Sequence, residues 1–315
     1  MLAATAVGDP VMARILTDHG ADANAVGGMG YSALSAASAE GHEELVNVLL
    51  EAGADVDIPN VDGDMPLFST VIRKGAEAVV RMLIEYGADV NHVHRIYRCT
   101  PILFAAKEGR NKAMKVLFEG GADIHFTARR GYTPLVYAVQ GVNKKGAKLL
   151  LIDWGADVNV RNDRRETPLL IAVMENLHTM FMPLIKNGAM VNVKNNQGHT
   201  PWTRCVLKGN ESMARMLIDN GADINVPGVL LSENSDKDRL PDVVRRIVNS
   251  SPNDMTWQLS GSQVIARLSA TPLLLTTAFG HDNIATLLIG KGADVNELQD
   301  HGFYDGFVHC RNSGA

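Results

Sequence analysis

Residues 100–123 read TPILFAAKEGRNKAMKVLFEGGAD, and this stretch decides the fold because both of its ends recur along the chain at a nearly fixed distance. The string Gly-Ala-Asp begins at Gly20, Gly53, Gly87, Gly121, Gly155, Gly221 and Gly292, with the variant Gly188-Ala189-Met190 before the sixth copy. Successive copies lie 33 or 34 residues apart, and only the last gap is longer, at 71 residues. A period of this length is the mark of a chain built from stacked repeats.

A second string is phased to the first and marks where each unit begins. It occurs at Thr100-Pro101, Thr133-Pro134, Thr167-Pro168, Thr200-Pro201 and Thr271-Pro272, with degenerate copies at Ser32-Ala33 and Met65-Pro66. Thr caps a helix N-terminus, Pro suits the first helical position, and the Gly suits the left-handed turn that ends a helix. Each unit is therefore predicted to be two short helices joined by a turn, and it buries its apolar face only by stacking.

The phase, the period and the Thr-Pro string resemble those of ankyrin repeats, whose consensus contains T-P-L-H-x-A. The resemblance covers nearly the whole chain. It implies an all-α solenoid of helix–turn–helix units with β-hairpin fingers between them. The histidine of the consensus is absent here, and we expect its replacements to pack in the core instead. These replacements are Ser35, Phe68, Leu103, Val136, Leu170, Thr203 and Leu274.

The repeats predict the domain organisation. We expect a partial N-terminal unit at 1–31, six repeats at 32–226, a finger insertion at 227–267, a seventh full repeat at 268–299 and a partial or divergent unit at 300–315. The insertion adds about 38 residues, because 71 residues separate two copies where 33 are usual. The two ends fit either a piece of a longer array or divergent caps on a complete protein.

Apolar residues recur at helical spacing within the insertion and predict an amphipathic helix. They are Leu240, Val243, Val244, Ile247 and Val248. The apolar face of this helix either packs on the neighbouring repeats or binds a partner. We expect packing, because monomeric proteins rarely expose a large apolar patch.

Composition excludes several classes of function. The net charge is −5, whereas a general nucleic-acid binder carries a basic footprint, so we expect no nucleic-acid partner. No apolar run reaches the roughly 18 residues of a membrane span, so we expect no membrane insertion. Cys99, Cys205 and Cys310 lie far apart without a CxxC pair, which indicates reduced thiols and an intracellular location, cytoplasmic or nuclear.

The chain contains none of the common catalytic or cofactor-binding strings, so we expect neither enzymatic activity nor a cofactor. His92, His94 and His125 form the one metal-like cluster in the sequence. A zinc site needs about four ligands, and no fourth ligand is evident. We therefore expect no bound metal and interpret these residues as surface histidines.

The resemblance to ankyrin repeats implies protein binding through the fingers and through the concave face formed by the first helices. Three consecutive fingers, at 91–99, 124–132 and 158–166, together carry a charge of +5, with Arg supplying every basic side chain. Arginine matches carboxylate and phosphate groups, which predicts an acidic or phosphorylated protein segment as the partner. The candidate partner-binding residues are Arg95, Arg98, Arg129, Arg130, Arg161, Arg164, Arg165, Phe104, Tyr137, Ile171 and Met174.

The sequence thus predicts a non-catalytic, monomeric scaffold or adaptor that binds another protein. One alternative is a regulatory or sensing repeat array of a larger multidomain protein. A second alternative is an enzyme with its site in the insertion at 227–267, although that segment contains neither His nor Cys.

The family resemblance also implies substrates of an asparaginyl hydroxylase, which favours Leu eight residues before a finger Asn. Three pairs match, namely Leu83 with Asn91, Leu151 with Asn159, and Leu288 with Asn296. The alternative is that this Asn is a turn residue whose side chain bonds the backbone. We expect the structural role.

Overall fold

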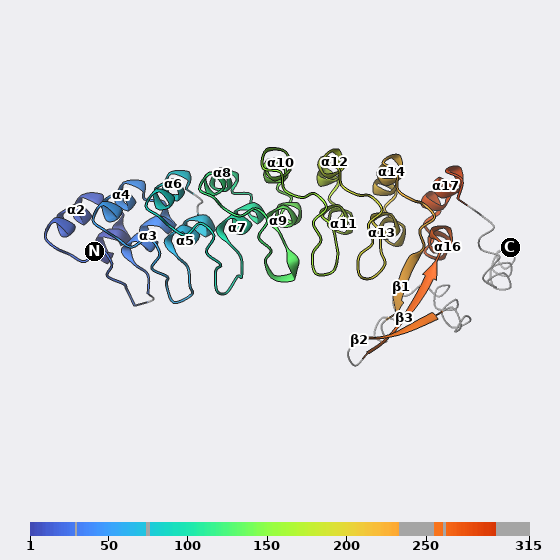
Figure 1. Cartoon of the computed structure of the whole chain (residues 1–315), viewed down its shortest axis with the longest axis horizontal. Coiled ribbons are helices and arrows are strands. Elements are labelled where there is room, and N and C mark those ends of the chain that lie inside the picture. The colour runs from blue at the N-terminus through green and yellow to red at the C-terminus, as the bar shows by residue number, and fades with distance from the viewer. Residues whose placement is uncertain (29, 74–75, 233–254, 261–262, 294–315) are drawn as a thin grey trace. The chain divides into compact units, whose positions relative to one another are not determined.

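The computed structural model describes residues 1–28, 30–73, 76–232, 255–260 and 263–293. The chain divides into two compact units, Met1–Asp163 (unit 1) and Arg164–Ala315 (unit 2). In unit 1 the helices follow one another as first and second helices of successive repeats (Figure 1). They are α1 Leu2–Val7, α2 Pro10–Asp18, α3 Ala33–Glu40, α4 Glu43–Glu51, α5 Pro66–Arg73, α6 Glu77–Glu85, α7 Pro101–Lys107, α8 Asn111–Glu119, α9 Pro134–Gln140 and α10 Lys144–Lys148, with a 3-10 turn η1 at Arg129–Gly131 and a π-helical segment η2 at Leu149–Asp153.

Unit 2 continues the same pattern and adds a small sheet. Its elements are α11 Pro168–Met174, α12 His178–Lys186, α13 Pro201–Lys208, α14 Glu211–Asp219, β1 Gly228–Ser232, β2 Met255–Ser260, β3 Gln263–Ala270, α16 Pro272–Ala278 and α17 Asp282–Gly290. In both units each first helix packs on the first helix of the next repeat. In unit 1 the second helices do the same, and in unit 2 α14 packs on α17. The core lies between these two helix layers, and the predicted helical repeat fold is confirmed.

The Thr-Pro strings act as helix starts, as predicted. The hydroxyls of Thr133, Thr167, Thr200 and Thr271 each accept the backbone N–H of the third helical residue, at 3.2–3.5 Å. The residues that replace the consensus histidine are buried: Phe68, Leu103, Val136, Leu170 and Leu274 are at most 5% exposed. Full burial of such a side chain stabilises the fold by roughly 1.5–3 kcal/mol, so apolar packing takes the place of the polar link.

The Gly-Ala-Asp string continues into a joint between neighbouring repeats. The Asp side chain accepts the N–H two residues later, as Asp89 does from Asn91 at 3.0 Å. Asn91 then bonds the next repeat with both ends of its amide: Oδ1 accepts from Asp123 N at 2.8 Å, and Nδ2 donates to the Gly121 carbonyl at 3.1 Å. The expected backbone-bonding role of Asn91 is therefore confirmed, while Asn296 lies outside the described residues.

The same joint recurs at other repeats. In unit 1, Asn24 accepts from Asp55 N at 2.7 Å and donates to the Gly53 carbonyl at 3.3 Å. In unit 2, Asn192 accepts from Asp223 N at 2.9 Å and donates to the Gly221 carbonyl at 3.1 Å. One amide side chain thus satisfies two backbone groups of the following repeat and fixes its position.

The second helix of the fourth repeat, which begins at Thr133, absorbs an extra residue. This unit has 22 residues between Thr133 and its Gly, where most units have 21. The end of the second helix widens into the π-helical segment η2, in which Trp154 N donates to the Leu149 carbonyl at 3.0 Å. A π-bulge takes up one residue without breaking a helix, so Gly155 stays in phase with the other units. The displaced Trp154 ring stacks on Phe118 at 4.4 Å between centroids.

The fingers differ from the expected β-hairpins. Outside the insertion, the described fingers contain one isolated bridge, Val26 with Ser32, and no longer strand pairing. Each finger is a tight turn closed by a backbone hydrogen bond, such as Ala128 N to the Tyr132 carbonyl at 2.9 Å. About a dozen residues between helices leave room for a reversal but not for a ladder.

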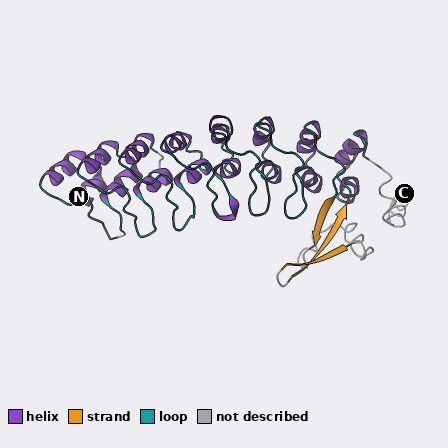
Figure 2. Ribbon diagram, viewed as in Figure 1, coloured by secondary structure: helices purple, strands orange, loops and turns teal. Residues whose placement is uncertain are grey.

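The described part of the insertion forms a three-stranded antiparallel sheet of order β1-β3-β2 (Figure 2). Gly228 pairs with Ala270, and Trp257 pairs with Ala266. The sheet prolongs the finger between α14 and α16, because β3 ends immediately before the Thr271 cap. We did not predict these strands from the sequence. The predicted amphipathic helix at 240–248 and the predicted unit at 300–315 lie outside the described residues.

Two joints of unit 1 lack the asparagine, those at residues 57 and 125, and the first yields a stability prediction. Asp57 takes the Asn position and accepts from Asp89 N at 3.3 Å, but a carboxylate has no N–H for the Gly87 carbonyl. Burial raises the pKa of Asp57, and the nearby carboxylates of Asp89 and Asp55 raise it further. We expect Asp57→Asn to restore the second bond and to raise the free energy of unfolding by about 0.5–1.5 kcal/mol in urea denaturation at pH 7.

The pH dependence of this gain provides the control. A carboxyl with a raised pKa in the folded state stabilises the fold at low pH and loses that contribution as pH rises through its pKa. The advantage of Asp57→Asn should therefore shrink as pH falls and Asp57 gains a proton that it can donate. An unchanged or lower unfolding midpoint at pH 7 would contradict this account.

Candidate functional site

The fingers of unit 1 carry five of the seven predicted arginines. We call residues 57–65 the second finger, 91–100 the third finger and 124–133 the fourth finger; they lead into α5, α7 and α9. In each finger the closing backbone hydrogen bond is donated by the seventh residue after the Gly of Gly-Ala-Asp. These seventh residues are Asn60, His94 and Ala128.

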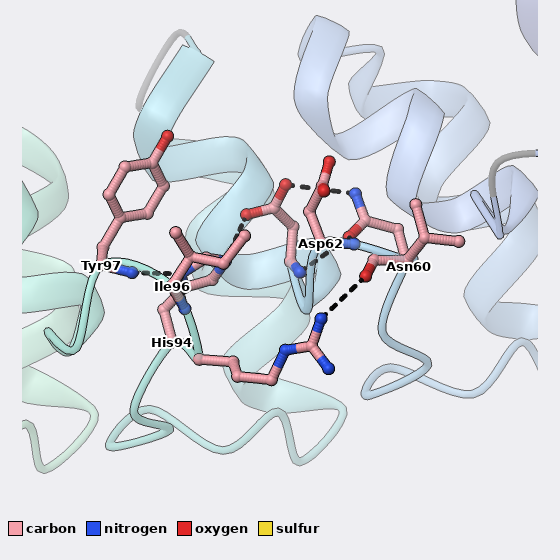
Figure 3. A network of polar contacts seen from close by, with 8 residues as sticks. Asn60, Asp62, His94, Ile96 and Tyr97 are labelled. Atoms are coloured by element: carbon pink, nitrogen blue, oxygen red, sulfur yellow. Dashed lines mark hydrogen bonds and ion pairs between the residues drawn. The ribbon is translucent and has the colours of Figure 1, made fainter.

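A polar network joins the second finger to the third (Figure 3). Asn60 Oδ1 accepts the backbone N–H of Asp62 at 2.9 Å and that of Asp64 at 2.8 Å. Asn60 Nδ2 donates to Asp64 Oδ2 at 3.1 Å. The other oxygen of this carboxylate, Oδ1, lies 2.8 Å from Nε2 of His94. Asp64 is therefore fixed by its own finger and faces the imidazole of the next one.

The imidazole of His94 makes contacts through both of its nitrogens and through the face of its ring. Its Nδ1 accepts the backbone N–H of Ile96 at 3.3 Å and that of Tyr97 at 3.1 Å. Its ring stacks on Phe68 with 4.5 Å between centroids and lies 4.8 Å from the ring of Tyr97. The residue is 0% exposed. Two donors at Nδ1 and a carboxylate at Nε2 together assign the neutral ring with its proton on Nε2.

The structure corrects the interpretation of His94 as a surface histidine. Burial lowers the pKa of His94, against the opposing influence of the Asp64 carboxylate. His92 is half-buried, and His125 is exposed. Among the residues that the structure describes, no group of three or more His, Cys, Asp or Glu is arranged to hold a metal ion.

The sequence did contain a signal for this role of His94. Aligning the units on Gly-Ala-Asp places His94 at the position of Asn60 and Asn195. In both of those fingers the Asn Oδ1 accepts two backbone N–H groups of the turn, as His94 Nδ1 does in the third finger. The histidine therefore replaces an amide acceptor with a titratable one.

Aromatic side chains cover the network and reach the surface. Tyr97 is 55% exposed, and its ring centroid lies 6.1 Å from those of both Phe68 and Phe104. Phe104 and Tyr137 are half-buried against a core that includes Phe68 and Leu103. Burial raises the pKa of Tyr137, which therefore stays a neutral phenol. These rings give the third and fourth fingers a partly apolar surface.

Three of the predicted arginines hold an unusual backbone conformation, Arg98 and Arg130 in unit 1 and Arg165 in unit 2. Their φ values of 53°, 66° and 57° lie in the left-handed region, which residues other than Gly, Asn and Asp disfavour. Arg98 and Arg165 stand two residues before their helix caps, where four other fingers have glycine with positive φ. These glycines are Gly30, Gly63, Gly131 and Gly198. All three arginine side chains are exposed.

Charge is segregated along unit 1, a feature that the net charge of the whole chain hides. Residues 1–93 carry 14 Asp and Glu against 4 Lys and Arg, whereas residues 94–163 carry 12 Lys and Arg against 6 Asp and Glu. The exposed arginines Arg95, Arg98, Arg129 and Arg130 lie in the basic segment. A count by repeat, instead of by whole chain, would have revealed this basic surface.

The remaining predicted binding residues do not all lie on a surface. Arg161 lies in unit 1, Arg164 and Arg165 lie in unit 2, and all three are exposed. Ile171 is 3% exposed and Met174 is half-buried, so Ile171 offers almost no surface for the predicted contact with a partner. An isoleucine is short enough to be covered within the helix layers of unit 2, whereas the longer rings at the same repeat position in unit 1 emerge.

The described cysteines have no reactive environment. Cys99 and Cys205 are free and buried. Burial raises the pKa of the Cys99 thiol to about 11 and that of the Cys205 thiol to about 12. Both remain protonated thiols at neutral pH, and thiols are poor nucleophiles.

Comparison with known proteins matches the repeats seen in the structure. The family model described as "Ankyrin repeats (3 copies)" matches residues 1–94, 71–162 and 152–227. The chain is 41% identical over 51 residues to the ankyrin repeat-containing protein P1E11.10 of Schizosaccharomyces pombe. That segment is 16% of this chain and 25% of the relative, so the chain spans about a quarter of the relative's length.

Among solved structures, the crystal structure of the human ASB11 ankyrin repeat domain resembles this chain with a TM-score of 0.61 and 27% identity, over 70% of this chain and 97% of that one. No helix in the described part of the chain is long and apolar enough to cross a membrane. Ankyrin repeats are in general protein–protein interaction modules, and the fold is typically non-catalytic. With its family model matched from residue 1 to residue 227, the chain belongs to the ankyrin-repeat family.

Proposed function

We propose that unit 1 binds an acidic or phosphorylated segment of another protein through its third and fourth fingers and through α7 and α9. The module acts by binding alone, as a scaffold or adaptor. We name as its contact surface the exposed arginines Arg95, Arg98, Arg129 and Arg130 together with Tyr97, Phe104 and Tyr137, and we call this set the finger surface. Arg161 extends the surface towards the end of unit 1.

The observation that carries the proposal is the left-handed backbone at Arg98 and Arg130. This conformation costs a non-glycine residue roughly 1–2 kcal/mol, and at the position of Arg98 four other fingers avoid the cost with glycine. Strained residues persist where their side chains serve function, because stability alone favours their replacement. The strain therefore supports a binding role for these two guanidinium groups.

The chemistry of the finger surface fits an acidic segment. A guanidinium group presents a planar fork that bonds carboxylate or phosphate groups with two parallel hydrogen bonds. The exposed ring of Tyr97 lies between Arg95 and Arg98 in sequence and offers an apolar contact beside the charges. Arginine and tyrosine are the residue types that carry most of the binding energy at protein interfaces.

Charge reversal tests where the partner binds. We expect Arg98→Glu with Arg130→Glu to lower the capture of partner proteins from a cell extract, identified by mass spectrometry, by about tenfold or more at 0.1 M salt. Each reversed charge at an interface removes an attraction and adds a repulsion.

The matched control makes the same change in charge away from the fingers. Lys144 and Lys145 are exposed on α10, and Lys144→Glu with Lys145→Glu should leave capture unchanged. If both variants lost capture of partner proteins equally, the loss would follow from the net charge of the chain and not from the position of the arginines. Full recovery of every partner by the finger variant would refute the proposed surface.

A second test separates binding from stability at one position. Arg98→Gly should hold or raise the unfolding free energy, by up to about 1 kcal/mol, because relief of backbone strain outweighs the added entropy of the unfolded chain. Arg98→Ala keeps the strain and should not gain stability. Both variants should bind the partner more weakly, because both lose the guanidinium group.

Urea denaturation and the capture assay measure the two effects on the same preparations. If Arg98→Gly were less stable than Arg98→Ala, the arginine side chain would have a structural role that its exposure does not show. If both variants kept wild-type binding, the strain at Arg98 would have no link to partner recognition.

A further inference from the structure

We infer that His94 is the positioning residue of the finger surface and that proton uptake by its imidazole releases the tip of the third finger, residues 95–98. In its neutral form the ring holds this tip in place. In its protonated form the ring cannot, and, if the proposed function is correct, the affinity for the partner falls. The inference therefore adds a pH control to the proposed binding site.

The hydrogen bonds of His94 make its protonation and the ordered tip incompatible. A neutral ring with its proton on Nε2 keeps the 2.8 Å contact with Asp64 at one nitrogen and accepts the N–H groups of Ile96 and Tyr97 at the other. A second proton would sit on Nδ1 and point at these two N–H groups. A donor cannot accept, so both bonds to the tip must break.

The tip is the part that is free to move. The His94 ring is 0% exposed and lies flat against Phe68, with 11° between the ring planes. Ile96 and Tyr97 are each 55% exposed, and Arg95 and Arg98 are also exposed. A buried imidazolium needs water or a full set of acceptors. Opening of the tip gives water access to the charged ring without breaking the core beneath it.

The charged and uncharged groups around His94 determine whether the buried ring favours its neutral or its protonated form. From the second finger, Asp64 and Asp62 favour the protonated ring; from its own finger, His92 opposes it. From α5, the contact is the uncharged ring of Phe68, and Phe104 of α7 packs behind that ring. The guanidinium group of Arg95 points to the carbonyl of Val61 at 3.3 Å.

We call the finger closed when His94 holds the tip in place and open when the tip is released. In the closed finger, burial outweighs the two carboxylates and lowers the pKa of His94 below 6.5. In the open finger the ring regains contact with water and a more ordinary pKa. Below pH 6.5 the open form therefore binds more protons than the closed form, and the closed finger loses stability as pH falls. The ordered tip belongs to neutral pH, and acidification releases it.

Other fingers of the same chain show the non-titrating version of this arrangement. In the second finger Asn60 accepts two turn N–H groups, and in unit 2 Asn195 accepts those of Gln197 and His199. An amide oxygen performs the same holding role at any pH. His94→Asn is therefore a matched control that keeps the acceptor and removes the proton.

The first experiment uses the chain without any partner. Backbone amide resonances of Ile96 and Tyr97 are followed by NMR from pH 8 to pH 4.5, and circular dichroism confirms that each variant is folded. We expect one transition below pH 6.5 in the wild type and none in His94→Asn. His92→Asn should keep the transition. Asp64→Asn should move it to lower pH, because the carboxylate that favours the imidazolium is gone.

Two results would overturn the inference. One is a wild-type chain whose Ile96 and Tyr97 amides show no transition in this range. The other is a transition that survives in His94→Asn, or that is lost in His92→Asn instead, since another group would then be the titrating one.

The second experiment links the switch to binding with a defined probe, a fluorescein-labelled hexaglutamate peptide followed by fluorescence anisotropy. Between pH 7.5 and 5.5 we expect the wild type to lose at least threefold more affinity than His94→Asn. If both proteins lost the same amount of affinity, protonation of His94 would not control binding of the probe. Failure of the proposed function would look different: the amide transition would remain, and Arg98→Glu with Arg130→Glu would bind the probe as the wild type does.

Discussion

The fold of this chain depends on one hydrogen-bonded joint that is repeated along it. In that joint a Gly with positive φ ends the second helix, the Asp of Gly-Ala-Asp fixes a turn, and an Asn bonds two backbone groups of the following repeat. Asn91 provides the clearest case, with bonds to Asp123 N and to the Gly121 carbonyl. Helix layers stack by apolar burial, which has little directional preference. The directional amide bonds therefore supply the register that stacking alone leaves open.

Because the joint fixes each repeat at its base, the end of each finger can change without loss of the fold. The third finger uses this freedom twice. Counted from the Gly of Gly-Ala-Asp to the first residue of the next repeat, it is one residue longer than the second or fourth finger, and it replaces the usual acceptor with His94. It also places Arg98 in a conformation that glycine adopts without strain. Such departures lower stability locally while the joint below them stays intact, and this is where a binding surface can develop in a repeat protein.

Short-range patterns account for the features that were predictable from the sequence. The Thr caps, the helix pairs and the burial of residues such as Leu103 follow from strings within one unit. His94 could not be placed in this way, because its burial depends on Asp64 and Phe68 in the preceding repeat. Ile171 was misplaced for a related reason: repeat position gives the direction of a side chain, and its length then determines whether it reaches the surface. The strands β1 and β3 required pairing across an insertion whose apolar spacing suggested a helix.

The boundary between the acidic and the basic segments of unit 1 falls at the second and third fingers, where His94 lies. Asp64 and Asp62 belong to the acidic side, and Arg95 and Arg98 belong to the basic side. An acidic partner is attracted to repeats beyond residue 94 and repelled by those before it, which favours one docking position along the repeats. At the boundary itself, the carboxylates that repel such a partner also favour the proton on His94. Acidification therefore acts at the edge of the basic surface, where a loosened tip removes Tyr97 and Arg98 from the docking position while the arginines of the fourth finger stay in place.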